Sequence, residues 1–449
     1  MTLWTSAETE SATLGKASDR FAVGGLSIDT RTLKEGDLFV ALKGDNRDGH
    51  DYVGAAFAAK AGAALVSRAS AGAAGPLLTV ADTQRGLEDL ARAARARSNA
   101  KILAVTGSAG KTTTKEILRY ALNGLGSTHV SAASYNNHWG VPLSLAGLPE
   151  SSEFGVFEIG MNHAGEIRSL VSLVRPHGAL ITTIAPAHLE YFGSCEAIAD
   201  AKSEIFEGLV PGGFALIPAD NAYAGRLAAR AAQAKVSRIV RFGRSGEAKL
   251  LSFTPDGEGM RVQADILGQT VDCLVGAPGA HIAGNVVGAL AAVALMEGDV
   301  LNAAAGLKNF TALKGRGARF TAGDVTVIDE SYNANPASMA AALALLGAAK
   351  GRKIAVLGDM LEMGAGDHHA ALAAPIEQAN TDLVFAAGLE MKALWDRLPA
   401  NRRGAYAENS TALAPQLLVA VKSGDTVLVK GSNGAKMSVI VEALKARQK

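Results

Sequence analysis

Residues 106–113 read Thr-Gly-Ser-Ala-Gly-Lys-Thr-Thr, a pattern that can bind phosphate. Glycines let successive backbone N–H groups turn toward an anion, and a helix that starts behind them adds its positive dipole end. Lys111 would then reach β- and γ-phosphate oxygens, while the Thr112 hydroxyl would bind Mg²⁺. The generic pattern has glycine at position 105, where this chain has Val105, and the glycine here is Gly107. The loop predicts ATP or GTP binding, with a turn that holds no ligand as the alternative.

A buried strand and an amphipathic helix are predicted on either side of this loop. Residues 101–105 form a short apolar run, and apolar residues recur at helical spacing over 113–125. The order strand, glycine loop, helix is the context that a phosphate loop requires. The loop residues expected to contact ATP are Thr106, Gly107, Ser108, Ala109, Gly110, Lys111, Thr112 and Thr113.

Composition argues against several other classes of protein. The 44 Lys and Arg residues nearly balance 43 Asp and Glu residues, which disfavours binding of nucleic acid by bulk charge. No apolar run approaches the about 18–20 residues that cross a bilayer. The N-terminal segment carries Glu8 and Glu10 where a secretory signal has an apolar core. Two cysteines are too few for a disulfide framework, so we expect a cytoplasmic protein without membrane insertion.

Strand-like and helix-like runs alternate through most of the 449 residues. Further buried strands are expected at 154–159, 179–184, 214–217, 325–328, 353–357, 382–386 and 425–429. This alternation predicts an α/β fold with parallel sheets that helices cover on both faces. We expect three domains: a small mixed α/β domain over 1–90, a central domain with a parallel sheet of the P-loop ATPase type over 91–312, and a Rossmann-like domain over 313–449.

Other segments occur along nearly the whole chain in the order typical of the Mur ligases, which build the peptide of peptidoglycan. The loop variant TGSAGKTT resembles that family, as do YNNHWGVPL at 135–143 and DESYNANPASM at 329–339. The remaining segments that carry the resemblance are 27–31, 36–44, 48–51, 158–160, 165–167, 188–190, 201–206, 357–362 and 430–432.

The resemblance implies an ATP-dependent ligase that converts a carboxylate into an acyl phosphate and couples it to an amine. Domain 1–90 would bind a UDP-muramoyl substrate, and domain 313–449 would close over ATP and the acceptor. The form YNANPASM is similar to the member that acts last, which adds D-alanyl-D-alanine to UDP-N-acetylmuramoyl-tripeptide, and a monomer is implied. Another step of the same series stays open, as does a nucleotide-gated binding protein without ligase activity.

Glu158 interrupts an apolar run at the carboxyl end of a predicted strand, where open parallel sheets bind ligands. A buried carboxylate there needs a cation, either Mg²⁺ or the partner in a salt bridge. From residue type alone His188 would be a hydrogen-bonding histidine and Lys202 a surface lysine. The resemblance implies instead that both bind a second metal ion, with Lys202 carbamylated by CO₂. With Thr112 these residues form the implied metal site, and with Lys111 the implied catalytic set.

The resemblance also implies contacts to the larger ligands. Contacts to ATP outside the loop are implied for Asn285, Arg316, Asp329, Glu330 and Asn333. Contacts to the UDP-muramoyl substrate are implied for Ser27, Thr30, Arg31, Asp45, Asn136 and Asn137. Asn335, which precedes Pro336, is expected only to cap the helix that follows.

Overall fold

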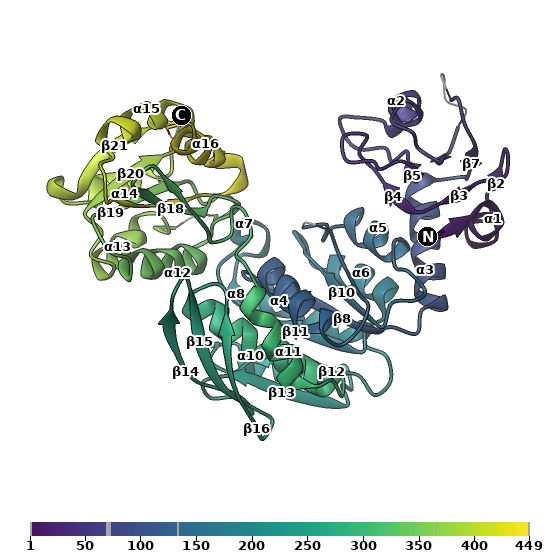
Figure 1. Cartoon of the computed structure of the whole chain (residues 1–449), viewed down its shortest axis with the longest axis horizontal. Coiled ribbons are helices and arrows are strands. Elements are labelled where there is room, and N and C mark those ends of the chain that lie inside the picture. Colours follow the sequence, from purple (N-terminus) through teal and green to yellow (C-terminus); the bar gives the residue numbers. More distant parts are fainter. Residues whose placement is uncertain (1, 69–72, 133, 365, 448–449) are drawn as a thin grey trace.

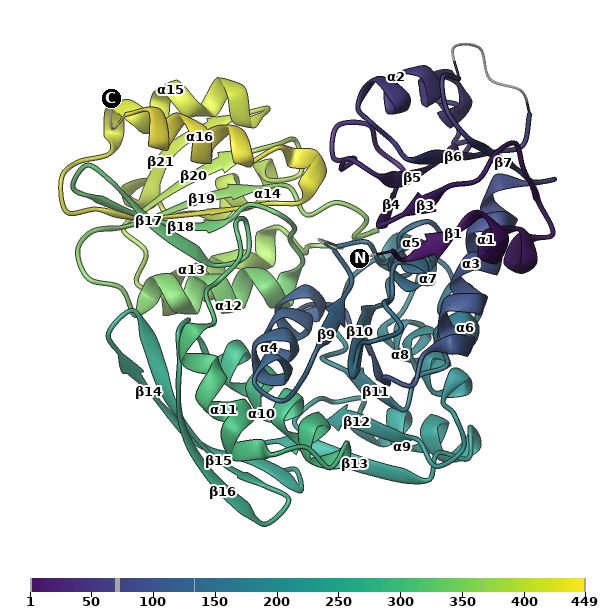
Figure 2. The same cartoon turned by 45° about the vertical axis from the view of Figure 1, so that its right-hand side comes forward.

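The computed structural model describes residues 2–68, 73–132, 134–364 and 366–447, which form an N-terminal, a central and a C-terminal lobe. Figure 1 shows the purple N-terminal lobe and the yellow-green C-terminal lobe on the same side of the central lobe, and Figure 2 shows the same arrangement from another side. The predicted α/β fold class is confirmed. No helix in the described ranges is long and apolar enough to cross a membrane.

A small sheet with the strand order β2-β7-β6-β5-β4 forms the N-terminal lobe. Strands β4 to β7 are parallel and β2 is antiparallel to β7. The elements of this part are β1 (Trp4–Thr5), α1 (Ser6–Thr13), β2 (Lys16–Ala17), β3 (Ala22–Val23), β4 (Gly25–Ser27), β5 (Asp37–Val40), η1 (Gly49–Tyr52), α2 (Val53–Ala58), β6 (Ala63–Val66), β7 (Leu77–Thr79) and α3 (Thr83–Arg97).

The central sheet has the order β16-β15-β14-β13-β12-β11-β8-β10-β9. Its parallel part matches the predicted strands at 101–105, 154–159, 179–184 and 214–217. The antiparallel extension β14-β15-β16 was not predicted. The elements are β8 (Lys101–Thr106), α4 (Lys111–Asn123), β9 (Thr128–Val130), α5 (Gly140–Ala146), β10 (Phe154–Glu158), α6 (Glu166–Val174), β11 (Gly178–Ile181), α7 (Leu189–Phe192), α8 (Cys195–Ser203), η2 (Glu204–Gly208), β12 (Phe214–Pro218), α9 (Ala224–Gln233), β13 (Arg238–Gly243), β14 (Ala248–Asp256), β15 (Gly259–Ile266), β16 (Gln269–Val275), α10 (Ala280–Leu295), α11 (Val300–Gly306) and η3 (Leu307–Asn309).

The C-terminal sheet has the order β17-β18-β22-β19-β20-β21 and is parallel except for β17. The four strands predicted over 325–429 are all present. The elements are β17 (Ala318–Ala322), β18 (Val325–Glu330), α12 (Pro336–Gly347), β19 (Lys353–Gly358), η4 (Ala370–Leu372), α13 (Ala373–Gln378), β20 (Leu383–Ala387), α14 (Lys392–Arg397), η5 (Ala400–Arg402), β21 (Arg403–Ala407), α15 (Ser410–Ala420), β22 (Thr426–Lys430), η6 (Asn433–Ala435) and α16 (Ser438–Ala446).

The expected domain limits at 90 and 313 stay predictions. Residue 90 lies inside α3, which packs on α1 and β6 of the N-terminal lobe and on α5 and α6 of the central lobe. Residue 313 lies in the loop between η3 and β17. Helix α3 therefore joins the two lobes through shared packing.

Trp4 ties the first strand of the N-terminal lobe to the central lobe. Its indole is 2% exposed, and Nε1 donates a hydrogen bond to the carbonyl of Ala146 in α5 at 2.9 Å. The Arg97 guanidinium lies 3.8 Å from the centroid of the Trp4 ring. The Trp4 ring is thus buried between the N-terminal lobe and the central lobe.

We expect Trp4→Ala to destabilise the protein by about 3–5 kcal/mol, because a large buried side chain is lost at this junction. Trp4→Phe keeps a ring but leaves the Ala146 carbonyl without its donor, so a smaller loss of about 1–3 kcal/mol is expected. Thermal unfolding followed by circular dichroism measures both. Equal melting temperatures for Trp4→Ala and wild type would contradict the assigned role.

Candidate functional site

The phosphate loop lies between β8 and α4, at the carboxyl end of the central sheet. Gly107 has a φ of 150° and Gly110 a φ of 80°. A Cβ on Gly107 would lie 1.9 Å from Oγ1 of Thr182, so only glycine fits there. Thr182 directly follows β11, and this close approach of Thr182 to the loop explains why position 107 is a glycine.

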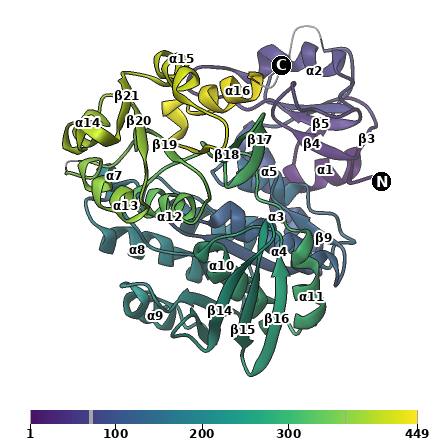
Figure 3. The same ribbon diagram turned by 60° about the vertical axis from the view of Figure 1, so that its left-hand side comes forward.

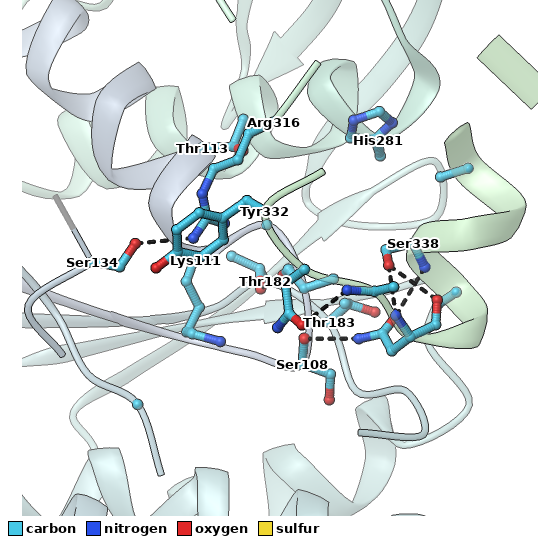
Figure 4. Close-up of a pocket in the computed structure, with 18 of the residues that line it drawn as sticks. Ser108, Lys111, Thr113, Ser134, Thr182, Thr183, His281, Arg316, Tyr332 and Ser338 are labelled. Atoms are coloured by element: carbon cyan, nitrogen blue, oxygen red, sulfur yellow. Dashed lines mark hydrogen bonds between the residues drawn. The ribbon is translucent and has the colours of Figure 1, made fainter. Parts of the chain in front are cut away.

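A cavity of about 750 Å³ lies between the central and C-terminal lobes, with this loop in its wall. Figure 4 shows side chains from both lobes around it, including Lys111 from the loop and Arg316 and Tyr332 from the C-terminal lobe. The predicted site residues that line the cavity are Ser108, Ala109, Gly110, Lys111, Thr113, Asn136, Asn137, Glu158, His188, Asn285, Arg316, Glu330 and Asn333.

Glu158 is fully buried at the end of β10. One carboxylate oxygen accepts a hydrogen bond from the Thr112 hydroxyl at 2.7 Å, and the other accepts one from the Asn136 amide at 2.7 Å. Within the described chain Glu158 forms no salt bridge, so the alternative of an ordinary ion pair is not found. A buried carboxylate with neutral donors still favours a cation nearby, which fits Mg²⁺.

Neither Lys111 nor Lys202 forms a salt bridge among the described residues, although the charge of Glu158 acts on Lys111 against the effect of burial on its pKa. The Lys111 amine donates to the carbonyl of Gly107 at 2.8 Å, and burial lowers its pKa. Lys202 is 1% exposed, and no hydrogen-bond or ion-pair partner for its amine occurs among the described residues. Burial, with a further contribution from the charge of Lys111, holds the pKa of Lys202 well below its ordinary value. The expectation from residue type that Lys202 is a surface lysine is therefore wrong.

His188 precedes α7 with a left-handed φ of 58°. Its Nδ1 lies 2.5 Å from a carboxylate oxygen of Glu362, which belongs to the C-terminal lobe. Burial lowers the pKa of the ring, and the charge of Lys202 acts in the same direction while that of Glu362 opposes it.

Few acidic side chains gather at the implied metal site. Over residues 2–68, 73–132, 134–364 and 366–447, no group of three His, Cys, Asp or Glu side chains could hold a metal ion. The implied set of Thr112, Glu158, His188 and Lys202 contains one carboxylate. A carbamate on Lys202 would supply the second, and the buried, unpaired amine of Lys202 fits that modification.

The C-terminal lobe contributes two further polar contacts to the central lobe. The Arg316 guanidinium donates to the Ser134 hydroxyl at 2.9 Å and lies 3.9 Å from the centroid of the Tyr332 ring. The Asn335 amide donates to the carbonyl of Ser108 in the phosphate loop at 3.1 Å. Asn335 caps α12 as predicted, but the expectation that it does nothing else is wrong.

Several predicted residues do not line the cavity. Asp329 is 1% exposed and accepts hydrogen bonds from the backbone of Gly315 and from Ser331, so it holds a loop and does not reach the cavity surface. The predicted residues that lie below the cavity surface or outside its lining are Thr106, Gly107, Thr112 and Lys202. Those that lie on the N-terminal lobe, away from the cavity, are Ser27, Thr30, Arg31 and Asp45.

Sequence reasoning missed Ser134, Tyr332, Glu362 and Lys430 as cavity residues. Lys430 is 2% exposed, and its amine donates to the Asn333 carbonyl at 2.8 Å and lies 3.4 Å from the Glu330 carboxylate. A lysine directly after the predicted strand 425–429 was a usable signal, because Lys430 ends its strand as Glu158 does.

Comparisons with known proteins agree with this geometry. Residues 105–293 match the Mur ligase middle domain, residues 315–433 the glutamate ligase domain of Mur ligases, and residues 22–121 the catalytic domain of the Mur ligase family. The chain belongs to the Mur ligase family.

Two sequence relatives that match nearly the whole chain carry the same name. The chain is 38% identical to UDP-N-acetylmuramoyl-tripeptide–D-alanyl-D-alanine ligase of Escherichia coli (strain K12), over 93% of each chain. It is 33% identical to the enzyme of that name from Rickettsia prowazekii (strain Madrid E), over 98% of this chain and 99% of the relative. A crystal structure of MurF from Acinetobacter baumannii superposes with a TM-score of 0.87 at 29% identity, and 99% of each chain is covered.

We expect Gly107→Ala to weaken nucleotide binding by at least about tenfold, which corresponds to about 1.4 kcal/mol, because the new methyl group would displace Thr182 and deform the loop. Titration calorimetry with Mg-ATP measures the affinity. Gly225→Ala in α9 is the matched control, since apart from its chain neighbours and the backbone of its own helix no atom lies within 4 Å of the new Cβ. A Gly107→Ala protein that melts normally and binds ATP like the wild type would contradict this account of the loop.

Proposed function

We propose that this protein joins D-alanyl-D-alanine to UDP-N-acetylmuramoyl-tripeptide in a reaction driven by ATP. The observation that carries the proposal is the cavity in which the phosphate loop, Glu158 and Arg316 converge from two lobes. The names of relatives that match along nearly the whole chain indicate which carboxylate and which amine are joined.

A carboxylate does not react with an amine at neutral pH, so the first step activates it. The terminal carboxylate of the tripeptide attacks the γ-phosphorus of ATP, the bond to the β-phosphate oxygen breaks, and ADP leaves. Lys111 from the central lobe and Arg316 from the C-terminal lobe offset the negative charge of the transferring phosphoryl group. Lys111 donates one hydrogen bond to the carbonyl of Gly107 in this structure, and its ammonium group has two further N–H donors for phosphate oxygens.

In the second step the neutral amine of D-alanyl-D-alanine attacks the acyl carbon. A tetrahedral intermediate forms and collapses with loss of inorganic phosphate, and the nitrogen gives up a proton as the amide forms. Mg²⁺, held by Thr112, Glu158, His188 and a carbamylated Lys202, would neutralise charge on the phosphates when bound. Water would hydrolyse the acyl phosphate, which is why a cavity between two lobes suits the chemistry.

The proposal extends to the other ligands and to the state of the protein. The N-terminal lobe, including Ser27, Thr30, Arg31 and Asp45, would hold the UDP-muramoyl part, and the tripeptide would pass Asn136 and Asn137. The domain limits would be near 90 and 313. The proposal includes the monomeric state that the family resemblance implies, and ATP as substrate supports action in the cytoplasm.

The ligation test measures phosphate release with UDP-muramoyl-tripeptides that end in lysine or diaminopimelate, with and without D-alanyl-D-alanine. Release should require both partners and give a UDP-pentapeptide by mass spectrometry. Lys111→Ala should lower kcat by about 10²–10³-fold, because one charge-stabilising donor is lost. Lys350→Ala, an exposed lysine of the C-terminal lobe, is the control. Release with single amino acids would assign an earlier step, and ATP binding without turnover would refute ligase activity.

The carbamate on Lys202 has its own test. Burial lowers the pKa of Lys202, and this favours the neutral form of the amine, which is the form that takes up CO₂. Enzyme exchanged into ¹³C-bicarbonate should show a carbamate carbon by NMR, and CO₂-depleted enzyme should lose activity that bicarbonate restores. Lys202→Arg should show neither effect. A wild-type spectrum identical to that of Lys202→Arg would rule the modification out.

A further inference from the structure

Glu362 is not among the residues assigned to the reaction, yet it contacts one of them across the lobes. Its carboxylate lies 2.5 Å from Nδ1 of His188, and its backbone carbonyl accepts a hydrogen bond from the backbone of Glu190 at 3.3 Å. Glu362 and His188 both line the cavity. One residue of the C-terminal lobe thus makes a side-chain and a main-chain contact with the start of α7.

The loop that carries Glu362 is fixed to its own lobe. The backbone of Met360 donates to Nε2 of His369 at 2.9 Å, and the backbone of Leu361 donates to the Ser432 hydroxyl at 2.9 Å. Met363, directly after Glu362, is 5% exposed. Glu362 therefore moves with the C-terminal lobe and does not follow the central lobe on a flexible loop.

Both partners of the contact have an unusual backbone. His188 has a φ of 58° and Glu362 a φ of 63°, in the left-handed region that residues with a Cβ seldom adopt. Leu189, next to His188, packs against the core of the central lobe and also against the core of the C-terminal lobe. Figure 3 shows α7 beside the C-terminal lobe. His188 and Glu362 both have an unfavourable backbone conformation and contact each other, which indicates that this contact is maintained for function.

The chemistry of the contact fixes the histidine ring. A carboxylate can only accept, so Nδ1 of His188 carries the proton, and Nε2 is the nitrogen left for a phosphate or a metal ion. The two side chains are 24% and 40% exposed, and an ion pair of that exposure adds little to stability. Orientation of the ring is the larger consequence of the contact.

We propose that Glu362 is a positioning residue that orients the His188 ring when the C-terminal lobe docks, so that docking also completes the phosphate and metal site. The inference rests on the proposed ligase function and deepens it. It makes a group on the C-terminal lobe responsible for the geometry of a group on the central lobe.

The first test compares kinetics of Glu362→Ala, Glu362→Gln and wild type in the ligation assay. Glu362→Ala should lower kcat by about 10–100-fold with little change in the KM for ATP, as for other residues that orient a metal-binding histidine. Glu362→Gln should recover most of the loss, because its amide oxygen still accepts from Nδ1. Glu377→Ala, an exposed glutamate of α13, is the matched control and should behave as wild type. A Glu362→Gln protein as slow as Glu362→Ala would overturn the proposal.

The second test measures metal binding and does not require D-alanyl-D-alanine. Mn²⁺ binding to the enzyme–ADP complex, followed by electron paramagnetic resonance, should weaken by about tenfold or more in Glu362→Ala and stay unchanged in Glu377→Ala. Unchanged Mn²⁺ affinity in Glu362→Ala with a normal melting temperature would overturn the proposal, because Glu362 would then serve docking alone. A wild-type protein without ligation would refute the proposed function instead, and the Mn²⁺ comparison would still be readable.

Discussion

Positive charge gathered in one cavity is the constraint on which the rest of the structure depends. Lys111 comes from the phosphate loop, while Lys430 and Arg316 come from the other lobe. Glu158 is the buried carboxylate at the same place, and burial lowers the pKa of both lysines. Bringing these groups together without an anion is unfavourable, whereas a polyphosphate supplies the missing negative charge. Because Arg316 belongs to the C-terminal lobe, binding of that anion and docking of the lobes favour each other.

The order of the strands in the central sheet brings the charged residues of the site together. Strand β8 pairs with β10 on one side and with β11 on the other, all parallel, so their carboxyl ends share one edge of the sheet. The phosphate loop follows β8, Glu158 ends β10, and Thr182 follows β11. Thr182 donates to the Ala109 carbonyl and approaches Gly107 so closely that the loop has one available path. The topology of the sheet therefore positions both the anion-binding loop and the carboxylate that faces it.

The features predicted from sequence are those that leave a local pattern. Apolar runs located the parallel strands, glycines located the loop, and a carboxylate inside an apolar run located Glu158. The antiparallel extension β14-β15-β16 escaped because its apolar residues alternate with polar ones over 248–275, which is a weaker signal than a continuous apolar run. Burial of Lys202 opposed the preference of its residue type, and the partner of His188 is 174 residues away in sequence. Such contacts depend on the tertiary arrangement, which local patterns do not encode.

Contacts between the central and C-terminal lobes at the cavity are polar and modest. The bonds Arg316–Ser134 and Asn335–Ser108 each contribute about 1 kcal/mol net, and the more exposed pair Glu362–His188 adds little. Ligand contacts to both lobes can therefore decide whether the lobes are docked. A ligase that forms an acyl phosphate has two opposed needs: exclusion of water while the intermediate exists, and separation of the lobes to release ADP, phosphate and product. A large apolar interface would meet the first need and fail the second. Polar contacts made by residues of the site meet both needs. The negative charge of the nucleotide strengthens the association of the lobes, and the association weakens when the nucleotide leaves.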